Sequence, residues 1–221
     1  YQLVNIKRLH DVEVTFKPCV HDAAGVASSF LQEYFYQDLF VAQMVFDKRP
    51  VKLADVGSRV DGYVANVASF REITVFDIRP LSNTIKNVNF IIRDITKIVP
   101  SGNTYDMVTC LHALEHLGLG RYGDPITKSA VSDGVLSLSN LVSDNGMLVI
   151  STPIGKERIE FNANWVFDPG RLFRIFESCG LSVEETYKFD SASNCFELIL
   201  SEEVFEMSDV DYCLAIFVLK K

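Results

Sequence analysis

The chain has 221 residues, 48% of them hydrophobic and 23% charged, which is enough for one sizeable core and at most a small accessory element. Its net charge of −8 argues against broad binding to a nucleic-acid backbone, which needs clustered Lys and Arg. The five cysteines form no CxxC pair, and we find neither a signal peptide nor an apolar run long enough to cross a bilayer, so we expect one cytoplasmic domain over residues 1–221 without a nucleic-acid partner or a membrane span.

Helix-like and strand-like periodicity alternate along the chain, beginning with a helical pattern at 26–46. Its aromatic-rich segment FLQEYFYQDLFVAQMVF suits either a cap on a sheet or a contact in a homodimer, and we treat residues 20–48 as an N-terminal helical extension. Further helices are predicted at 61–69, 129–143 and 169–179, the last between Asp168-Pro169 and Gly180. Strands are predicted at 52–56, 72–77, 88–92, 105–111, 146–152, 181–189 and 210–219.

This alternation predicts an α/β fold with a doubly wound, mostly parallel sheet of the Rossmann-like kind, covered by helices on both faces in a three-layer sandwich. One segment, 191–208, fits no single pattern. Its stretch NCFELILSEEVFEM is compatible with a strand, a helix or an inserted hairpin, and we leave it open as a candidate insertion.

The stretch DVGSRVDGYVANVASFREITVFD, residues 55–77, has features of a nucleotide-binding turn. A buried strand leads into Gly57, where the missing Cβ lets the backbone approach a ligand, and the free amides of the next helix favour polar or anionic groups. Asp77 follows 20 residues later, the spacing at which a carboxylate meets ribose hydroxyls in nucleotide-binding α/β folds. Arg59 stands where the phosphate-binding fingerprint needs a third glycine, so a dinucleotide is the poorer fit.

Plainer roles for these residues stay open. Gly57 and Gly62 are also compatible with ordinary turn glycines. Asp77 could pair with Arg79, and Asp94 could cap a short helix.

His112, Glu115 and His116 form the densest cluster of titratable side chains in the chain. A helical turn would place the two histidines on one face, a spacing that can bind a metal, but the HExxH order is absent and no third ligand is predictable, so we predict no metal site. Because the ordinary pKa of histidine lies near physiological pH, either histidine could serve as a general base, with a capping or core role as the alternative.

Two segments, GLGRYGDP at 118–125 and GKERIEFNANWVFDP at 155–169, are expected to form one wall of a binding site. Their polar groups alternate with aromatics, as a site for a sugar-like substrate requires, although ordinary connections that anchor aromatics in the core would look the same. The residues predicted to bind such a substrate are Arg121, Tyr122, Asn162, Asn164 and Trp165.

Several motifs together resemble, in their order, those of the class I S-adenosylmethionine-dependent methyltransferases, over about residues 50–180. They are Asp55-Val56-Gly57, Asp77, Asp94 in FIIRDIT, TYDMVTCLHALEHLG at 104–118 and LVSDNGMLVISTP at 141–153. Within that superfamily, DVGSRVDGYVANVASFREITVFDIRPL, LHALEHLGLGRYGDP and IEFNANWVFDP more closely resemble an uncharacterised branch, the domain of unknown function 268. The resemblance implies a seven-stranded sheet with an antiparallel last strand and the cofactor S-adenosyl-L-methionine across the carboxyl ends of the first strands.

The resemblance also implies roles for matching residues. Asp55 and Gly57 would line the methionine end of the cofactor, and Asp77 would accept both ribose hydroxyls. Asp94 and Ile95 would meet adenine, which needs an acceptor for its amine and an apolar wall. The predicted cofactor-binding residues are Asp55, Gly57, Ser58, Asp77, Ile78, Asp94, Ile95 and Leu111, and the predicted catalytic bases are His116 and His112.

We therefore predict an S-adenosylmethionine-dependent methyltransferase that acts on an oxygen or nitrogen of a small or glycan-like acceptor, mainly by positioning the reactants. The alternative is a non-catalytic module with this fold that binds the cofactor or a partner protein. A nicotinamide-dependent oxidoreductase is disfavoured by Arg59 and by DNGMLVISTP, which resembles the fifth strand of the methyltransferases.

Overall fold

The computed structural model describes residues 33–221 except 101, 103 and 161–162. Its strands are β1 Leu53–Val56, β2 Ile73–Asp77, β3 Val88–Ile92, β4 Tyr105–Leu111, β5 Val142–Ile154, β6 Arg158–Glu160, β7 Asn164–Val166, β8 Ser182–Asp190, β9 Cys195–Ile199 and β10 Cys213–Lys220. Its helices are α2 Glu33–Lys48, α3 Ala65–Ala68, α4 Ala130–Leu141, α5 Pro169–Ser178 and α6 Ser201–Glu206, with short helical turns η1 Val60–Val64, η2 Leu114–His116 and η3 Met207–Asp209. Among these described helices, none combines the length and apolarity of a membrane span.

Eight strands form the main sheet, in the order β3-β2-β1-β4-β5-β10-β8-β9. The strands from β3 to β5 are parallel, whereas β10 is antiparallel to both of its neighbours. The predicted mostly parallel sheet with an antiparallel last strand is thus confirmed. It has one strand more than the resemblance implies, because β9 pairs with β8 at one edge.

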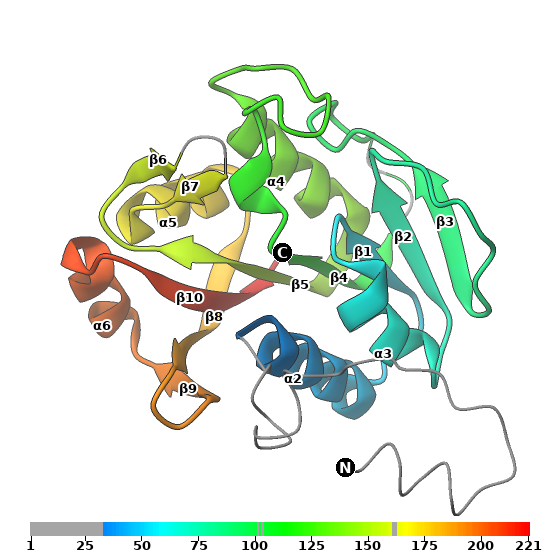
Figure 1. The fold of residues 1–221 in the computed structure, drawn as a ribbon, viewed down its shortest axis with the longest axis horizontal. Helices are drawn as coiled ribbons and strands as arrows, with labels where there is room; N and C mark the ends of the chain where they lie inside the picture. Colours follow the sequence, from blue (N-terminus) through cyan, green and yellow to red (C-terminus); the bar gives the residue numbers. More distant parts are fainter. Residues whose placement is uncertain (1–32, 101, 103, 161–162) are drawn as a thin grey trace, which may run out of the picture. The chain divides into compact units, whose positions relative to one another are not determined.

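Helices cover both faces of this sheet (Figure 1), with α2 and α3 on one side and α4 and α5 on the other. The central strands are buried on both faces, so consecutive side chains enter different cores. In β10, Ile216 joins the core beside α2 and α3, and the next residue, Phe217, joins the core beside α4 and α5. This confirms the three-layer α/β architecture.

The N-terminal helix is described from Glu33, so the part of the predicted extension at 20–32 lies outside the described residues. Its inner face buries Val41 and Val45 against the sheet, as a capping helix does. The homodimer contact and the single domain over 1–221 remain predictions.

Two segments differ in detail from the sequence expectations, and a third, which the sequence left open, is assigned by the structure. The helix predicted at 61–69 consists of η1 followed by a four-residue α3, and Gly62, inside η1, has non-helical backbone angles. The segment 191–208 contains β9, α6 and the start of η3, so it begins as a hairpin with β8 and continues as a helix. The connection after β5 contains a small hairpin of β6 and β7.

Candidate functional site

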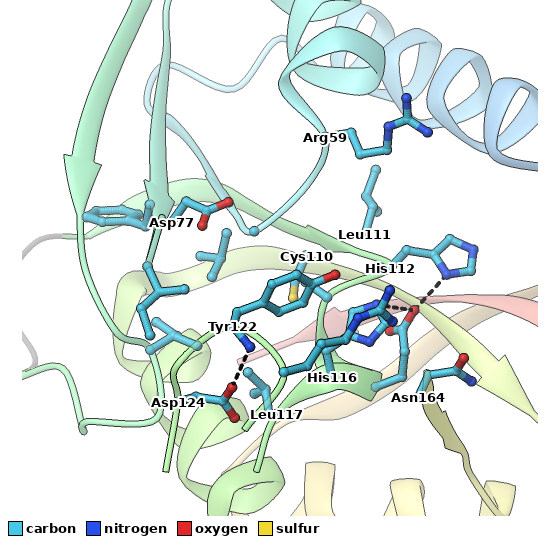
Figure 2. A pocket seen from close by; sticks show the side chains of 18 of the residues that line it. Arg59, Asp77, Cys110, Leu111, His112, His116, Leu117, Tyr122, Asp124 and Asn164 are labelled. Atoms are coloured by element: carbon cyan, nitrogen blue, oxygen red, sulfur yellow. Dashed lines mark hydrogen bonds and ion pairs between the residues drawn. The ribbon is translucent and has the colours of Figure 1, made fainter. Parts of the chain in front are cut away.

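A cavity of about 380 Å³ lies at the carboxyl ends of β1, β2 and β4 (Figure 2). Gly57 follows β1, Asp77 ends β2, and His112 follows β4, and all three line the cavity. The strand order reverses between β1 and β4, which makes this the crevice where open α/β sheets bind ligands. Helix α2 contributes Tyr34, Gln37 and Asp38 to the lining.

The two glycines of the first turn have different purposes. Gly57 has a φ of +75°, and an added Cβ would lie 2.8 Å from the Cβ of Ala113, so both conformation and space require glycine. Gly62 lies outside the cavity lining, and a Cβ there would collide with the carboxylate of Asp38. The missing side chain of Gly62 therefore makes room for Asp38 of α2 and does not serve the approach of a ligand to the backbone.

Asp55 and Ser58 lie behind the cavity surface, so the structure does not support direct cofactor contacts for them. The buried carboxylate of Asp55 accepts hydrogen bonds from Ser58 Oγ (2.6 Å), Thr109 Oγ1 (2.7 Å) and the Ser58 N–H (3.1 Å). Ser58 Oγ in turn accepts from the Leu111 N–H (3.1 Å). Burial raises the pKa of Asp55 to about 6, although these hydrogen bonds act in the opposite direction. Both side chains stabilise the turn that carries Gly57.

Asp77 lines the cavity, but its carboxylate is already engaged by Arg79. The Arg79 N–H and Nε donate to Oδ1 over 2.8 and 3.0 Å, and Nη2 donates to Oδ2 over 2.7 Å. A carboxylate has about four acceptor positions, so one stays free, whereas a ribose hydroxyl pair needs two. The ion pair considered from the sequence is therefore present, and the Arg79 guanidinium also lies 4.7 Å from the centroid of the Tyr122 ring.

The residues predicted to meet adenine gather at the cavity beyond β3. Asp94 Oδ1 accepts from the N–H (3.0 Å) and hydroxyl (2.6 Å) of Thr96, as in a local cap, while Oδ2 lies 3.7 Å from Lys97 Nζ. Because Lys97 is mostly exposed, that long ion pair is weak and leaves Oδ2 available for another donor. Ile78 and Ile95 supply apolar surface to the same cavity.

His112 occupies an unusual backbone position at the end of β4. Its φ of +50° is uncommon for a residue with a side chain, and such strain concentrates at functional sites. Its Nδ1 lies 2.7 Å from Oε1 of Glu115, a buried carboxylate that also accepts from Thr152 Oγ1 (3.3 Å). The Nε2 atom of His112 is buried and has no hydrogen-bond partner in the described part of the chain.

His116 reaches the same carboxylate from the other side. Its Nδ1 lies 2.8 Å from the carbonyl oxygen of Ala163, and its Nε2 lies 3.9 Å from Glu115 Oε1. Burial lowers its pKa, which favours the neutral ring. The two histidines meet through Glu115 and not along a helical face, since His112 precedes the single 3-10 turn η2. Across residues 33–221, outside the gaps named above, no three His, Cys, Asp or Glu side chains are grouped to hold a metal.

The two segments predicted to bind the acceptor, 118–125 and 155–169 (the acceptor segments), meet at one backbone oxygen. Arg121 Nη1 donates to the Ala163 carbonyl (2.7 Å), the same atom that faces His116. Arg121, Tyr122 and Asn164 line the cavity, with Tyr122 partly exposed. The buried carboxylate of Asp124 orders the first segment by accepting from the N–H groups of residues 118, 120 and 122.

Trp165 does not line the cavity. Side chains alternate along β7, so Asn164 faces the cavity and Trp165 the other side. There it stacks on Phe167 with ring centroids 5.9 Å apart, and the Arg171 guanidinium lies 4.8 Å from its ring. Asn162 lies outside the described residues.

Sequence reasoning missed part of the lining. Tyr34 and Gln37 come from a helix for which the sequence suggests only a cap on the sheet or a homodimer contact, and the burial of Gln37 is visible only in the structure. Glu115 was noticed in the histidine cluster without a role, and its spacing of three residues from His112 fits the observed contact. Tyr212, at the other end of the chain, has no sequence signal that links it to the site.

Solved structures share this fold at low sequence identity. Magnesium protoporphyrin IX methyltransferase ChlM from Synechocystis, with bound S-adenosylmethionine, has a TM-score of 0.57 and 15% identity over 86% of this chain and 80% of that chain. The N-methyltransferase NodS from Bradyrhizobium japonicum, in complex with S-adenosylhomocysteine, has a TM-score of 0.57 and 11% identity over 88% and 91%. The [4+2]-cyclase SpnF has a TM-score of 0.56 and 13% identity over 82% and 80%. These likenesses establish the fold and not the reaction.

No curated protein sequence matches the chain significantly. Residues 74–221, about two thirds of the chain, match the family described as Caenorhabditis protein of unknown function, DUF268. That range contains Asp77, Asp94, both histidines and both acceptor segments. The chain therefore belongs to the DUF268 family, and its fold is that of the class I S-adenosylmethionine-dependent methyltransferases.

Proposed function

We propose that this protein is an S-adenosylmethionine-dependent methyltransferase acting on an oxygen or nitrogen of a small or glycan-like acceptor. The observation that carries the proposal is the succession of Gly57, Asp77 and Asp94 along one cavity, each just after or at the end of one of the first three strands. The two histidines line the same cavity, next to the acceptor segments.

The residues of the cavity fit the parts of this cofactor. Asp77 would hold the ribose once Arg79 gives up part of its hydrogen bonding, and Asp94 with Ile95 would hold adenine. The backbone of Gly57, at the turn after β1, lines the same cavity. A volume of about 380 Å³ falls within the usual range for small-molecule sites, roughly 300–1,000 Å³.

When bound, S-adenosylmethionine would supply a methyl group on a positively charged sulfur, and S-adenosylhomocysteine would leave with the electron pair of the broken carbon–sulfur bond. The protein would contribute mainly by orienting the acceptor along Arg121, Tyr122 and Asn164. A histidine of the cluster would remove the acceptor's proton, since a neutral imidazole nitrogen is a suitable base.

One observation favours the alternative, a non-catalytic module that binds the cofactor or a partner protein. The carboxylate expected to bind ribose is paired with Arg79 of the same chain. A module that had lost cofactor binding would retain such an internal pair.

Calorimetric titration with S-adenosylmethionine, S-adenosylhomocysteine and NAD distinguishes these functions. We expect S-adenosylhomocysteine to bind and to raise the melting temperature, because a ligand selective for the native state stabilises it. Asp77→Ala should weaken binding without unfolding the protein, while Asp144→Ala, which removes an exposed carboxylate outside the cavity, should not. Binding of NAD in the absence of any S-adenosylhomocysteine binding would refute the methyltransferase proposal, and absence of both would favour the partner-binding module.

A further inference from the structure

We propose that Glu115 is a positioning residue, which holds His112 in the tautomer whose Nε2 accepts the proton of the methyl acceptor. The inference rests on the proposed function for the source of that proton. Of the two candidate bases, His112 is then the one that takes the proton, and the buried carboxylate of Glu115 orients its ring.

The contact with Glu115 indicates which ring nitrogen of His112 carries hydrogen. Glu115 Oε1 lies 2.7 Å from His112 Nδ1, and Oε2 accepts from Thr152 Oγ1, so both oxygens of this buried carboxylate have a partner. An ionised carboxylate accepts hydrogen bonds and cannot donate them, so Nδ1 must be the protonated nitrogen. The lone pair of the neutral ring is then on Nε2.

Nε2 of His112 is a buried polar atom that lacks a partner among the described residues. Buried nitrogen atoms are nearly always hydrogen-bonded, and one that is not calls for a functional explanation. The side chain lines the cavity, and Figure 2 shows the bonded edge of its ring directed at the neighbouring carboxylate. The backbone maintains this arrangement through the φ of +50° at His112 and a hydrogen bond from its N–H to the Ser151 carbonyl (3.1 Å). A bound acceptor would provide the partner that Nε2 lacks.

His116 is less suited to the same task. Its Nδ1 faces the neutral carbonyl of Ala163, and among the residues that the structure describes no carboxylate lies within hydrogen-bond distance of either ring nitrogen. Burial and the nearby Arg121 guanidinium both disfavour its charged form, which lowers its pKa. A positive charge that forms on His112 is instead stabilised by the carboxylate of Glu115, which contacts the ring directly.

The proton balance is simple. As the acceptor's oxygen or nitrogen bonds to the methyl carbon, its O–H or N–H bond breaks and the proton forms an N–H bond at His112 Nε2. The electron pair of the broken bond stays with the acceptor atom, which ends neutral, and the positive charge resides on the imidazolium beside Glu115.

The test is nuclear magnetic resonance of the full chain labelled with ¹⁵N-histidine, without any ligand, because ¹⁵N shifts report which ring nitrogen is protonated. We expect His112 to be the Nδ1–H tautomer in the wild type and in Glu115→Gln, whose amide oxygen still accepts. Glu115→Ala should lose this tautomer, while the His116 signals should keep the Nδ1–H form in all three proteins. Glu160→Ala, which removes an exposed carboxylate paired with Arg158, is the matched control and should change neither histidine.

A wild-type His112 in the Nε2–H form, or an unchanged His112 tautomer in folded Glu115→Ala, would overturn the assignment. If circular dichroism shows that Glu115→Ala does not fold, the other two proteins decide: Nδ1–H in both supports the assignment, and Nε2–H in either overturns it. Titration of the same wild-type sample with S-adenosylhomocysteine separates the two proposals. Absence of binding with His112 as Nδ1–H refutes methyl transfer and leaves only the tautomer assignment of His112, whereas binding with His112 as Nε2–H refutes the role of Glu115 alone.

Discussion

Replacing Arg79 with alanine should tighten binding of S-adenosylhomocysteine, although it removes a residue that lines the cavity. Arg79 supplies three hydrogen bonds to Asp77, and a ribose hydroxyl pair must displace part of them. One of the three comes from the backbone N–H and survives the substitution. The side chain of Arg79 is 50% exposed, so solvent screens the ion pair, but its two-point contact with a carboxylate that is only 7% exposed places it near the upper end of exposed pairs, about 1 kcal/mol. Removing this competitor should therefore lower the Kd about fivefold.

Calorimetry with S-adenosylhomocysteine is the suitable assay, since this ligand lacks the sulfonium charge and does not respond to the lost cation as S-adenosylmethionine would. Arg174→Ala, which removes an exposed arginine outside the cavity, should leave the Kd unchanged. In the Asp77→Ala background, Arg79→Ala should have no effect, because the competition acts through that carboxylate. An unchanged or raised Kd for Arg79→Ala alone would refute this reasoning and indicate that Arg79 itself holds the ligand.

Three further predictions follow from the site. Burial raises the pKa of Asp55 from the ordinary 3.8 to about 6, so its stabilising contribution is complete below pH 4 and is lost as pH rises through 6. Between pH 4 and 7, the free energy of unfolding of the wild type, measured in urea, should fall by roughly 2–3 kcal/mol relative to that of Asp55→Asn. A difference between the two proteins that stays constant with pH would contradict this. His112→Gln should retain cofactor affinity but lose roughly 10²–10⁴-fold in turnover, and His116→Gln should lose less; equal turnover in both variants and the wild type would leave positioning as the only mechanism. Tyr122→Ala and Asn164→Ala should raise the acceptor KM in steady-state assays with cofactor affinity unchanged, and weakened cofactor binding in either variant would place the acceptor wall wrongly.

The main sheet was predictable because its central strands are continuous apolar runs bounded by polar turns. The predicted limits of β3 and β4 coincide with those in the structure. The break in the helix predicted at 61–69 was not predictable, because nothing in the residue pattern specifies the non-helical backbone angles of Gly62. The hairpin of β6 and β7 escaped as well, since three-residue strands carry too little periodicity to recognise.

For the site, topology was a better guide than side-chain direction. Asp77, Asp94 and His112 line one cavity because each lies at or just beyond a carboxyl end of neighbouring parallel strands. Asp55 does not line the cavity, because its carboxylate accepts hydrogen bonds within the turn after β1. Trp165 does not line it either, because its side chain lies on the other side of β7. The contact between His112 and Glu115 depends on a positive φ, which no residue pattern specifies at a histidine.

The hydrogen bonds to the Ala163 carbonyl have an evolutionary consequence. Because this hydrogen-bond acceptor is a main-chain carbonyl oxygen, every amino acid at position 163 supplies it. Selection for this attachment therefore leaves no signature in the identity of that residue. Substitutions in the hairpin of β6 and β7 could thus change the side chains that face a bound molecule, while His116 and Arg121 remain bonded to the same carbonyl oxygen. Related proteins could differ in the side chains of this hairpin while the attachment to position 163 stays the same, and comparison of their sequences at this position would not reveal it.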